Sequence, residues 1–234
     1  MLKPNPGRTA RAFGLRGGDV LIGLDGAPFR GTPDVLAVRM APAAPGREVA
    51  LTLWRDGRVF SVLAPRPDLG HWAVASSELC SRIGTEPDLA EAAERPGLRS
   101  WELWCGPARN SQRPADLLAL GEDWLAVALP PLWMLNRRLW TPFVAVVLAC
   151  LATALVSPFL ALLAYGLVML CTRRARLTLL RGQATTAGLG FWMVIAAHDE
   201  REAQNVAQRL DPALCFRWGA KPVAVQAPSL AEIG

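Results

Sequence analysis

An uncharged apolar stretch from Thr141 to Cys171 constrains the fold of this chain more than any other feature. The stretch holds no Asp, Glu, Lys, Arg or His, which is typical of a membrane segment rather than of a core helix. A single straight helix over it would be about 46 Å long, whereas the hydrocarbon layer of a bilayer is about 30 Å thick. The sequence therefore predicts an integral membrane protein with either one over-long tilted helix or two short helices.

Ser157-Pro158 in the middle of the stretch and arginines at both of its ends favour two helices. Proline lacks a backbone N–H and disfavours helix in the residue before it. The positive-inside rule places both basic ends in the cytoplasm, which a single span cannot achieve. We therefore expect a transmembrane hairpin over roughly Leu139–Val156 and Pro158–Cys171 in the bacterial inner membrane. The flanking arginines are Arg137 and Arg138 before it, and Arg173, Arg174, Arg176 and Arg181 after it.

A third apolar segment, at about 124–135, precedes the hairpin and is broken by Pro130-Pro131. It either lies in the membrane interface or forms the first half of a longer helix. Tryptophan and arginine near the ends of membrane segments are typical interface anchors, so membrane lipid is a predicted partner. The predicted anchors are Trp124, Trp133, Trp140, Arg137, Arg138, Arg173 and Arg174, and Trp192 would complete the tryptophan belt.

Residues 1–68 have the pattern of a small α/β module. Asp19–Gly26 reads as a short apolar strand that ends in an Asp-Gly turn. Thr32 is placed to cap a helix that begins at Pro33, where the missing N–H costs nothing, and runs to Met40. After it, Glu48–Trp54 and Val59–Ala64 form a predicted antiparallel pair across Asp56-Gly57.

The segments GLRGGDVLIGLDGAPF, TPDVLAVRM and PGREVALTLWRDGRVFSVLA, in this order, resemble a bacterial PDZ domain of the HtrA-protease type. The resemblance implies binding of a peptide that adds a strand to a sheet edge beside the helix. That family carries about two more strands upstream, so we expect an incomplete module: either Met1 is not the natural start or the domain is degenerate. An α/β module with no ligand is the alternative. The candidate groove residues are Val35, Leu36, Val38 and Met40.

Residues 69–100 read as a polar connector, 101–215 as the membrane unit and 216–234 as a tail. Within 190–210, Phe191–Ala197 is a predicted strand, and a helix follows it to about Leu210. A lone strand must pair with something, and the best candidates are Trp101–Cys105 and Leu117–Leu120. A small cytosolic α/β head would then form from both sides of the apolar segments.

The second half also resembles a family of small bacterial inner-membrane proteins of unknown function. The resemblance rests on LALGEDWLAVA, PPLWMLNRRLW and GFWMVIAAHDEREAQNVAQRL, and the chain departs from the family at Pro130 and Asn136. It implies a topology of strands around two hydrophobic segments, and it implies no chemistry.

Nothing in the sequence indicates catalysis. The two histidines, His71 and His198, have no H-E-x-x-H or second Cys/His cluster with them, and no G-x-S-x-G or nucleotide-binding fingerprint is present. Five cysteines without a C-x-x-C pair fit a reducing compartment. The net charge of +5 comes from arginines at the membrane border, which favours anionic lipid over nucleic acid. We expect no enzyme activity, no cofactor and no metal site.

The predicted fold class is α+β, with a small PDZ-like α/β module followed by a helical transmembrane hairpin that carries a small α/β cytosolic head. The predicted function is that of a non-enzymatic membrane-anchored protein with a PDZ-like protein-interaction module at the cytoplasmic face. Two alternatives stay open. The chain could be a structural or assembly subunit with an inert PDZ-like part, or a fragment of a longer protease-associated PDZ membrane protein.

Overall fold

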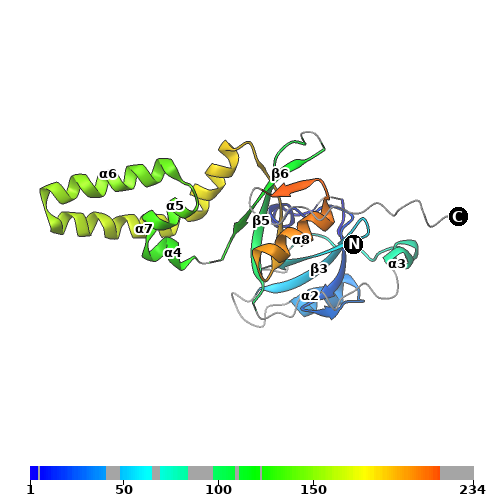
Figure 1. Cartoon of the computed structure of the whole chain (residues 1–234). Coiled ribbons are helices and arrows are strands. Elements are labelled where there is room, and N and C mark those ends of the chain that lie inside the picture. Colours follow the sequence, from blue (N-terminus) through cyan, green and yellow to red (C-terminus); the bar gives the residue numbers. More distant parts are fainter. Residues whose placement is uncertain are drawn as a thin grey trace. The chain divides into compact units, whose positions relative to one another are not determined.

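The computed structural model describes residues 1–4, 6–40, 48–64, 69–83, 97–108, 111–121 and 123–216. In these residues the fold is mixed α+β, with two four-stranded sheets and eight helices (Figure 1). Contacts divide the chain into two compact units. The sheet unit comprises Met1–Ala119 and Leu189–Gly234, and the hairpin unit comprises Leu120–Gly188.

The first sheet has the strand order β2-β1-β3-β4 and is antiparallel throughout. Asp56 and Gly57 join β3 to β4 with φ angles of 48° and 83°, the left-handed geometry whose twist matches the flanking strands of a tight hairpin. The predicted strands, turn and helix of this region are therefore confirmed. Their bounds are β1 Val20–Leu24, β2 Ala27–Pro28, α2 Pro33–Met40, β3 Val49–Arg55 and β4 Arg58–Ala64.

The second sheet has the strand order β7-β5-β6-β8. β5 pairs antiparallel with both β6 and β7, so segments on the two sides of the apolar stretch share one sheet, as predicted. Asp199 caps the helix after β7, because its carboxylate accepts the Glu202 N–H at 2.8 Å. The elements are β5 Arg99–Cys105, β6 Arg113–Ala119, β7 Gly190–Ala197, α8 Glu200–Leu210 and β8 Leu214–Phe216.

One hydrophobic core joins the two sheets of the sheet unit. Leu53 and Phe60 from the first sheet belong to the same buried cluster as Leu103 and Ile195 from the second. A close approach requires Gly14, whose φ is 70°, because a Cβ there would lie 2.4 Å from the Trp192 carbonyl oxygen. The compact units therefore differ from the expected division into 1–68, 69–100 and 101–215, since the PDZ-like strands and the head are packed together.

The described part of the expected connector also belongs to the sheet unit. Leu69 is fully buried in the shared core, and Trp72 forms an antiparallel bridge with Leu2. Two short helices complete the unit, α1 Arg8–Ala12 and α3 Ser77–Ile83.

A buried ion pair fixes the start of β1 to the end of β3. Arg55 donates from Nε to Asp19 Oδ1 at 2.6 Å and from Nη2 to Oδ2 at 2.7 Å. The Arg16 N–H donates to the same carboxylate at 2.8 Å. Asp19 is only 1 % exposed, and this two-pronged geometry with a third donor compensates for the loss of water around the charge.

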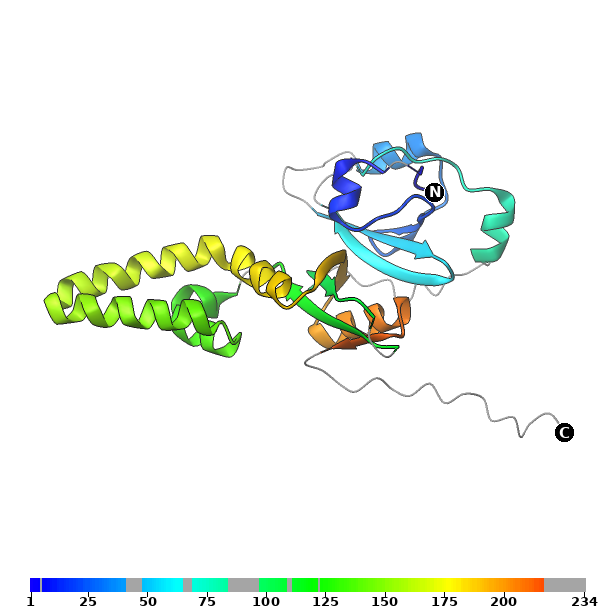
Figure 2. The ribbon, with the colours of Figure 1, turned by 90° about the horizontal axis from the view of Figure 1, so that it is seen from above.

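The described residues of the hairpin unit form four helices. Ser157 adopts an extended conformation with φ −162° and ψ 135°, and Pro158 begins the last helix, so the predicted break at this dipeptide is confirmed. The two long helices, α6 and α7, run back along each other (Figures 1 and 2). The bounds are α4 Trp124–Ala128, α5 Pro130–Asn136, α6 Trp140–Val156 and α7 Pro158–Thr186.

Among the residues that the structure describes, α7 is the one helix long and apolar enough to cross a bilayer, judged by length and composition, and 6 % of its apolar window is buried. α6 has 17 residues, and the segment at 124–135 is two short helices separated at Leu129, with Pro130 beginning the second. The helices therefore form a hairpin, but a transmembrane hairpin with two spans is not shown. α7 also continues past the expected end at Cys171 to Thr186, since no proline interrupts it there.

Candidate functional site

The outer half of the α6–α7 hairpin carries a continuous apolar surface. At its tip Leu155 is 89 % exposed, Val156 77 % and Phe159 73 %. Water-soluble surfaces seldom expose so many large apolar side chains side by side, and such a patch marks a surface that binds lipid or protein. Further exposed apolar residues on the two helices are Val144, Leu148, Leu151, Leu160, Leu162, Leu163, Leu167 and Leu170.

Two hydroxyl side chains inside this apolar surface, those of Thr153 and Tyr165, have partners within the unit. Thr153 Oγ1 lies 3.0 Å from the carbonyl oxygens of Ala149 and Cys150, and the Tyr165 hydroxyl donates to the Ala128 carbonyl at 3.2 Å. An internally satisfied hydroxyl can enter an apolar medium at a much lower cost than an unpaired one. The surface is therefore compatible with a water-free environment.

A polar clamp holds the base of the hairpin. Asp123 accepts the Trp133 Nε1–H at 2.9 Å and lies 4.0 Å from the Arg137 guanidinium. Arg176 donates to the Leu120 carbonyl at 3.2 Å, and Gln183 donates to the Arg137 carbonyl at 3.3 Å. These contacts tie α4, α5 and the last turns of α7 together, so the base has a defined structure while the tip stands free of it.

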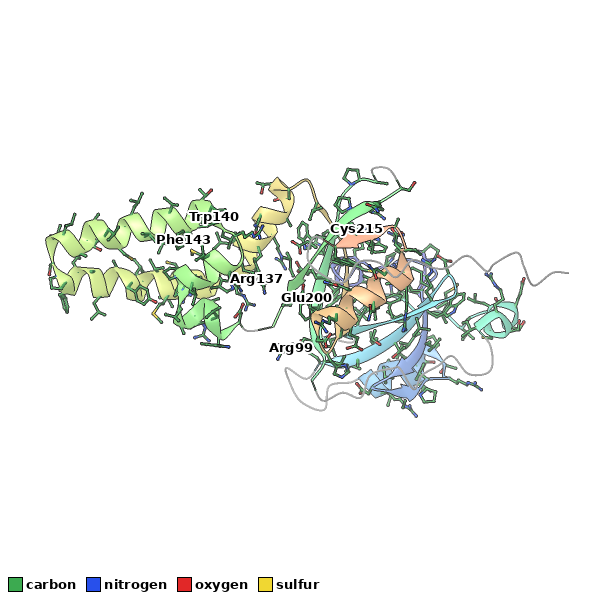
Figure 3. All side chains as sticks on the ribbon, in the orientation of Figure 1. Arg99, Arg137, Trp140, Phe143, Glu200 and Cys215 are labelled. Carbon is green, nitrogen blue, oxygen red and sulfur yellow. The ribbon has the colours of Figure 1, made fainter. Side chains whose placement is uncertain are left out.

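The predicted interface anchors fall into two groups. Trp124 is 73 % exposed and Trp140 59 %, and Trp140 stacks edge-on against Phe143 at 6.2 Å (Figure 3). Trp133 is 0 % exposed, which corrects its assignment as an interface anchor, because its ring is enclosed and its N–H is used within the protein. Trp192 likewise packs on the core of the sheet unit, with the Arg113 guanidinium 5.6 Å from its ring.

The predicted arginine anchors line the base of the hairpin. Arg138, Arg173 and Arg174 are exposed, and the Arg137 side chain is about a third exposed at 36 %. Several guanidinium groups beside an uncharged apolar surface are the arrangement that anionic lipid headgroups attract.

The predicted peptide-groove residues on α2 also differ in their exposure. Val35 and Val38 are 44 % and 75 % exposed, one helical turn apart, whereas Leu36 is 4 % exposed and belongs to the core. The side chain of Met40 lies outside the described residues. Two of the four candidates are thus available to a partner.

Backbone pairing beside Leu2 was not predicted from the sequence. The Leu2 N–H donates to the Asp19 carbonyl at 2.8 Å, and its own carbonyl accepts the Gly18 N–H at 3.0 Å. On the other side the Lys3 backbone N–H donates to the His71 carbonyl at 3.0 Å, and the Ala73 N–H donates to the Met1 carbonyl at 2.8 Å. Both edges of this first segment are therefore occupied. The apolar Trp72 within a polar stretch was the available signal.

The remaining reactive side chains show no convergent site. In the part of the chain that the structure describes, no three His, Cys, Asp or Glu residues are grouped so that they could hold a metal ion. His198 Nδ1 lies 2.9 Å from Glu202 Oε2 at the start of α8. Burial raises the pKa of the Cys105 thiol to about 12, so this thiol stays protonated and unreactive at neutral pH.

Comparison with known proteins supports one of the two resemblances. A stretch of 95 residues, 40 % of this chain, is 30 % identical to a probable periplasmic serine endoprotease DegP-like from Rhizobium meliloti (strain 1021). The match covers 18 % of that protein's length. No family model and no solved structure matches. The likeness supports an HtrA-related, PDZ-like region, and the resemblance to an inner-membrane family is left without support.

Proposed function

We propose that this chain is a non-enzymatic, membrane-anchored protein whose sheet unit contacts a protein partner through its PDZ-like part. The observation that carries the proposal is the uncharged hairpin with its exposed apolar tip, joined in one chain to a region similar to part of an HtrA-type protease. In water that tip would leave large apolar surfaces uncovered, and lipid removes this cost. Arginines at the base supply the charge that an anionic membrane surface attracts.

The pairing of β5 with β7 supports a hairpin unit that crosses a membrane an even number of times or not at all. The chain leaves the sheet unit after Ala119 and returns at Leu189, and both connections lead into one sheet. A folded sheet cannot lie on both faces of a bilayer. If the hairpin enters a membrane, it must therefore return to the face from which it entered.

The test of anchoring is flotation of the full chain with vesicles of phosphatidylethanolamine and phosphatidylglycerol. We expect it to float and to resist extraction by high salt and alkaline carbonate, because apolar insertion does not depend on charge screening. A chain that stays at the bottom of the gradient, or that salt releases, contradicts the proposal.

The partner contact is tested on the full chain in the same vesicles, because the PDZ-like strands share their core with the head. Peptides with free C-terminal carboxylates are titrated against the wild type and against a Val35→Ser/Val38→Ser double variant. We expect binding that the double variant weakens roughly tenfold or more. Val74→Ser is the control, since Val74 is equally apolar and 69 % exposed elsewhere in the unit.

A structural or assembly role is the second candidate, and the shared core favours it. The two sheets bury one cluster, and the edges beside Leu2 are already paired. β2, at the edge of the first sheet, is two residues long and includes Pro28, which donates no hydrogen bond to an added strand. If the role is structural, no peptide would bind, and the Val35→Ser/Val38→Ser variant would still form any complex that the wild type forms in cells. A piece of a longer protease-associated protein is the third alternative.

Two observations give opposite indications of the face of the membrane on which the sheet unit lies. The arginines favour a cytoplasmic sheet unit, whereas the similar protein is named as periplasmic. Cys80 is exposed on α3 and suits labelling from each face, while Cys105 is 7 % exposed and does not. We propose the cytoplasmic face, and labelling of Cys80 by an impermeant maleimide from outside spheroplasts would contradict it.

A further inference from the structure

We infer that the α6–α7 hairpin enters the bilayer and returns without emerging, so that its tip ends among lipid acyl chains. The inference rests on the proposed membrane anchor and deepens it, because it names the depth and the occupant of the apolar surface. Three features of the hairpin carry it: its tip chemistry, its length and its turn.

Tip chemistry distinguishes a buried turn from one that reaches water. A hairpin that crosses a bilayer exposes its connection to the far aqueous phase and usually places polar or charged residues there. Here the connection is Leu155-Val156-Ser157-Pro158-Phe159, with no charged residue between Trp140 and Thr172. Its apolar side chains are the most exposed of the hairpin. If the turn emerged on the far side of the bilayer, the largest apolar surface of the hairpin would therefore contact water.

The uncharged part of each arm is too short to cross, although α7 itself continues beyond that part to Thr186. On α6, 16 residue steps from Trp140 to Val156 give about 24 Å, and on α7, 15 steps from Pro158 to Arg173 give about 22 Å. The hydrocarbon layer is about 30 Å thick, and any tilt shortens the depth further. With the arginines held at the headgroups, the tip stops inside the far leaflet.

The turn leaves fewer backbone groups without a hydrogen-bond partner than two separate helix ends would. Two separate helix ends would leave four C=O and four N–H groups without intrahelical partners. Ser157 serves both helices, because its N–H donates to Thr153 at 3.0 Å and its carbonyl accepts the Ala161 N–H at 3.1 Å. Pro158 has no N–H to satisfy. The compact turn therefore lowers the cost that normally excludes irregular backbone from hydrocarbon.

Lipid is the occupant that fits these features. Exposed apolar side chains extend along both helices, the hydroxyls of Thr153 and Tyr165 are satisfied internally, and the base is basic where anionic headgroups would lie. A second copy of the chain would cover one side of the hairpin and is tested below as the competing occupant.

The first experiment labels a Ser157→Cys variant of the full chain in native membranes, with peptide mapping to read residue 157 separately from the five native cysteines. An impermeant charged maleimide should label it from neither face, because a thiol among acyl chains stays protonated. A lipid-soluble photoactivated probe that generates a carbene, which needs no thiolate, should label the tip segment in intact membranes. Labelling by the charged probe from the face opposite Cys80 shows a crossing hairpin and overturns the inference. Labelling by the charged probe from the same face as Cys80 also overturns the inference. Failure of the lipid-soluble probe overturns it as well, because a second copy of the chain then covers the tip.

The second experiment places a charge at the tip. Val156→Lys should lower the membrane-bound fraction of the full chain roughly tenfold or more, because a lysine in hydrocarbon is strongly disfavoured. Val74→Lys is the matched control on the sheet unit and should bind as the wild type does. Unchanged binding of Val156→Lys overturns the inference, since a tip in water tolerates the charge. If the wild type itself fails to float, the proposed anchor fails; if it floats and residue 157 emerges, only this inference fails.

Discussion

The β3–β4 hairpin and the α6–α7 hairpin are both rich in apolar residues, yet they bury them in opposite ways. In the first, Leu51, Leu53 and Val62 have no exposed surface, whereas in the second Leu155 is 89 % exposed and Phe159 73 %. Successive side chains of a strand point to opposite faces, and all five residues from Ala50 to Trp54 are buried, so the protein covers both faces of β3. The helical hairpin exposes large apolar side chains along both helices, and no described residue covers the side chains at its tip. The difference indicates that the two regions are built for two solvents.

The largest expected effect concerns thiols in the two regions. The pKa of Cys105 is raised from 9.0 to about 12, so its thiolate fraction at pH 8 falls about a thousandfold. Cys171, on the outer surface of α7, is exposed. In mild detergent, N-ethylmaleimide should modify Cys80 and Cys171 within minutes and leave Cys105 thiol intact, as read by peptide mapping. Raising the pH should speed Cys105 without a plateau below pH 11. Equal rates at pH 8 would show that the sheet unit opens readily.

Replacing one phenylalanine in each region compares packing directly. Phe60 is 2 % exposed beneath Arg55, so Phe60→Ala should cost about 3–5 kcal/mol of the unfolding free energy through lost burial and a cavity. Phe159→Ala, at a 73 % exposed position, should change it by less than about 0.5 kcal/mol. Urea unfolding of the full chain in detergent, followed by near-ultraviolet circular dichroism, measures both. A large effect of Phe159→Ala would mean that protein covers the tip.

Replacing one aspartate in each unit gives a second matched pair of variants. Asp19→Asn removes one charge of a buried pair and leaves Arg55 uncompensated, which should cost about 3 kcal/mol. Asp123 is 30 % exposed and lies 4.0 Å from Arg137, so Asp123→Asn should cost about 1 kcal/mol or less. The amide oxygen can still accept the Trp133 N–H. The same urea titration checks the order, and a larger effect at Asp123 would make the basic clamp a main stabilising element.

Tryptophans within the hairpin unit give the smallest expected difference. Trp133→Phe keeps an aromatic ring but leaves Asp123 without its indole donor, which should cost about 1–3 kcal/mol. It should also speed amide hydrogen exchange in α4 and α5. Trp140→Phe should leave exchange unchanged and instead reduce quenching of the protein's fluorescence by brominated lipids, because Trp140 is exposed at the start of α6. The reverse result would exchange the roles of the two residues.

Local features with strong backbone preferences were predictable from the sequence. Asp56-Gly57 accepts left-handed φ angles, Pro33 begins a helix and Pro158 separates two, because each residue restricts its own backbone whatever surrounds it. Strand Gly190–Ala197 was expected to need partners upstream, and it pairs with Arg99–Cys105. Burial of individual side chains was less predictable: Trp133 and Trp140 lie in the same arginine-flanked motif, yet only the first is enclosed.

The sequence by itself determined that the chain has an uncharged hairpin broken at Ser157-Pro158 and a PDZ-like run of strands, since charge, proline and periodicity are local properties. Only the tertiary structure decided that the PDZ-like strands and the head share one core, that residues near Trp72 pair with Leu2, and that Trp133 is internal. These outcomes depend on contacts that no local pattern contains, such as those between β4 and β7 and the hydrogen bond from Trp133 to Asp123. Such contacts are chosen by complementary shape and by the pairing of buried polar groups, and neither can be read from a local pattern.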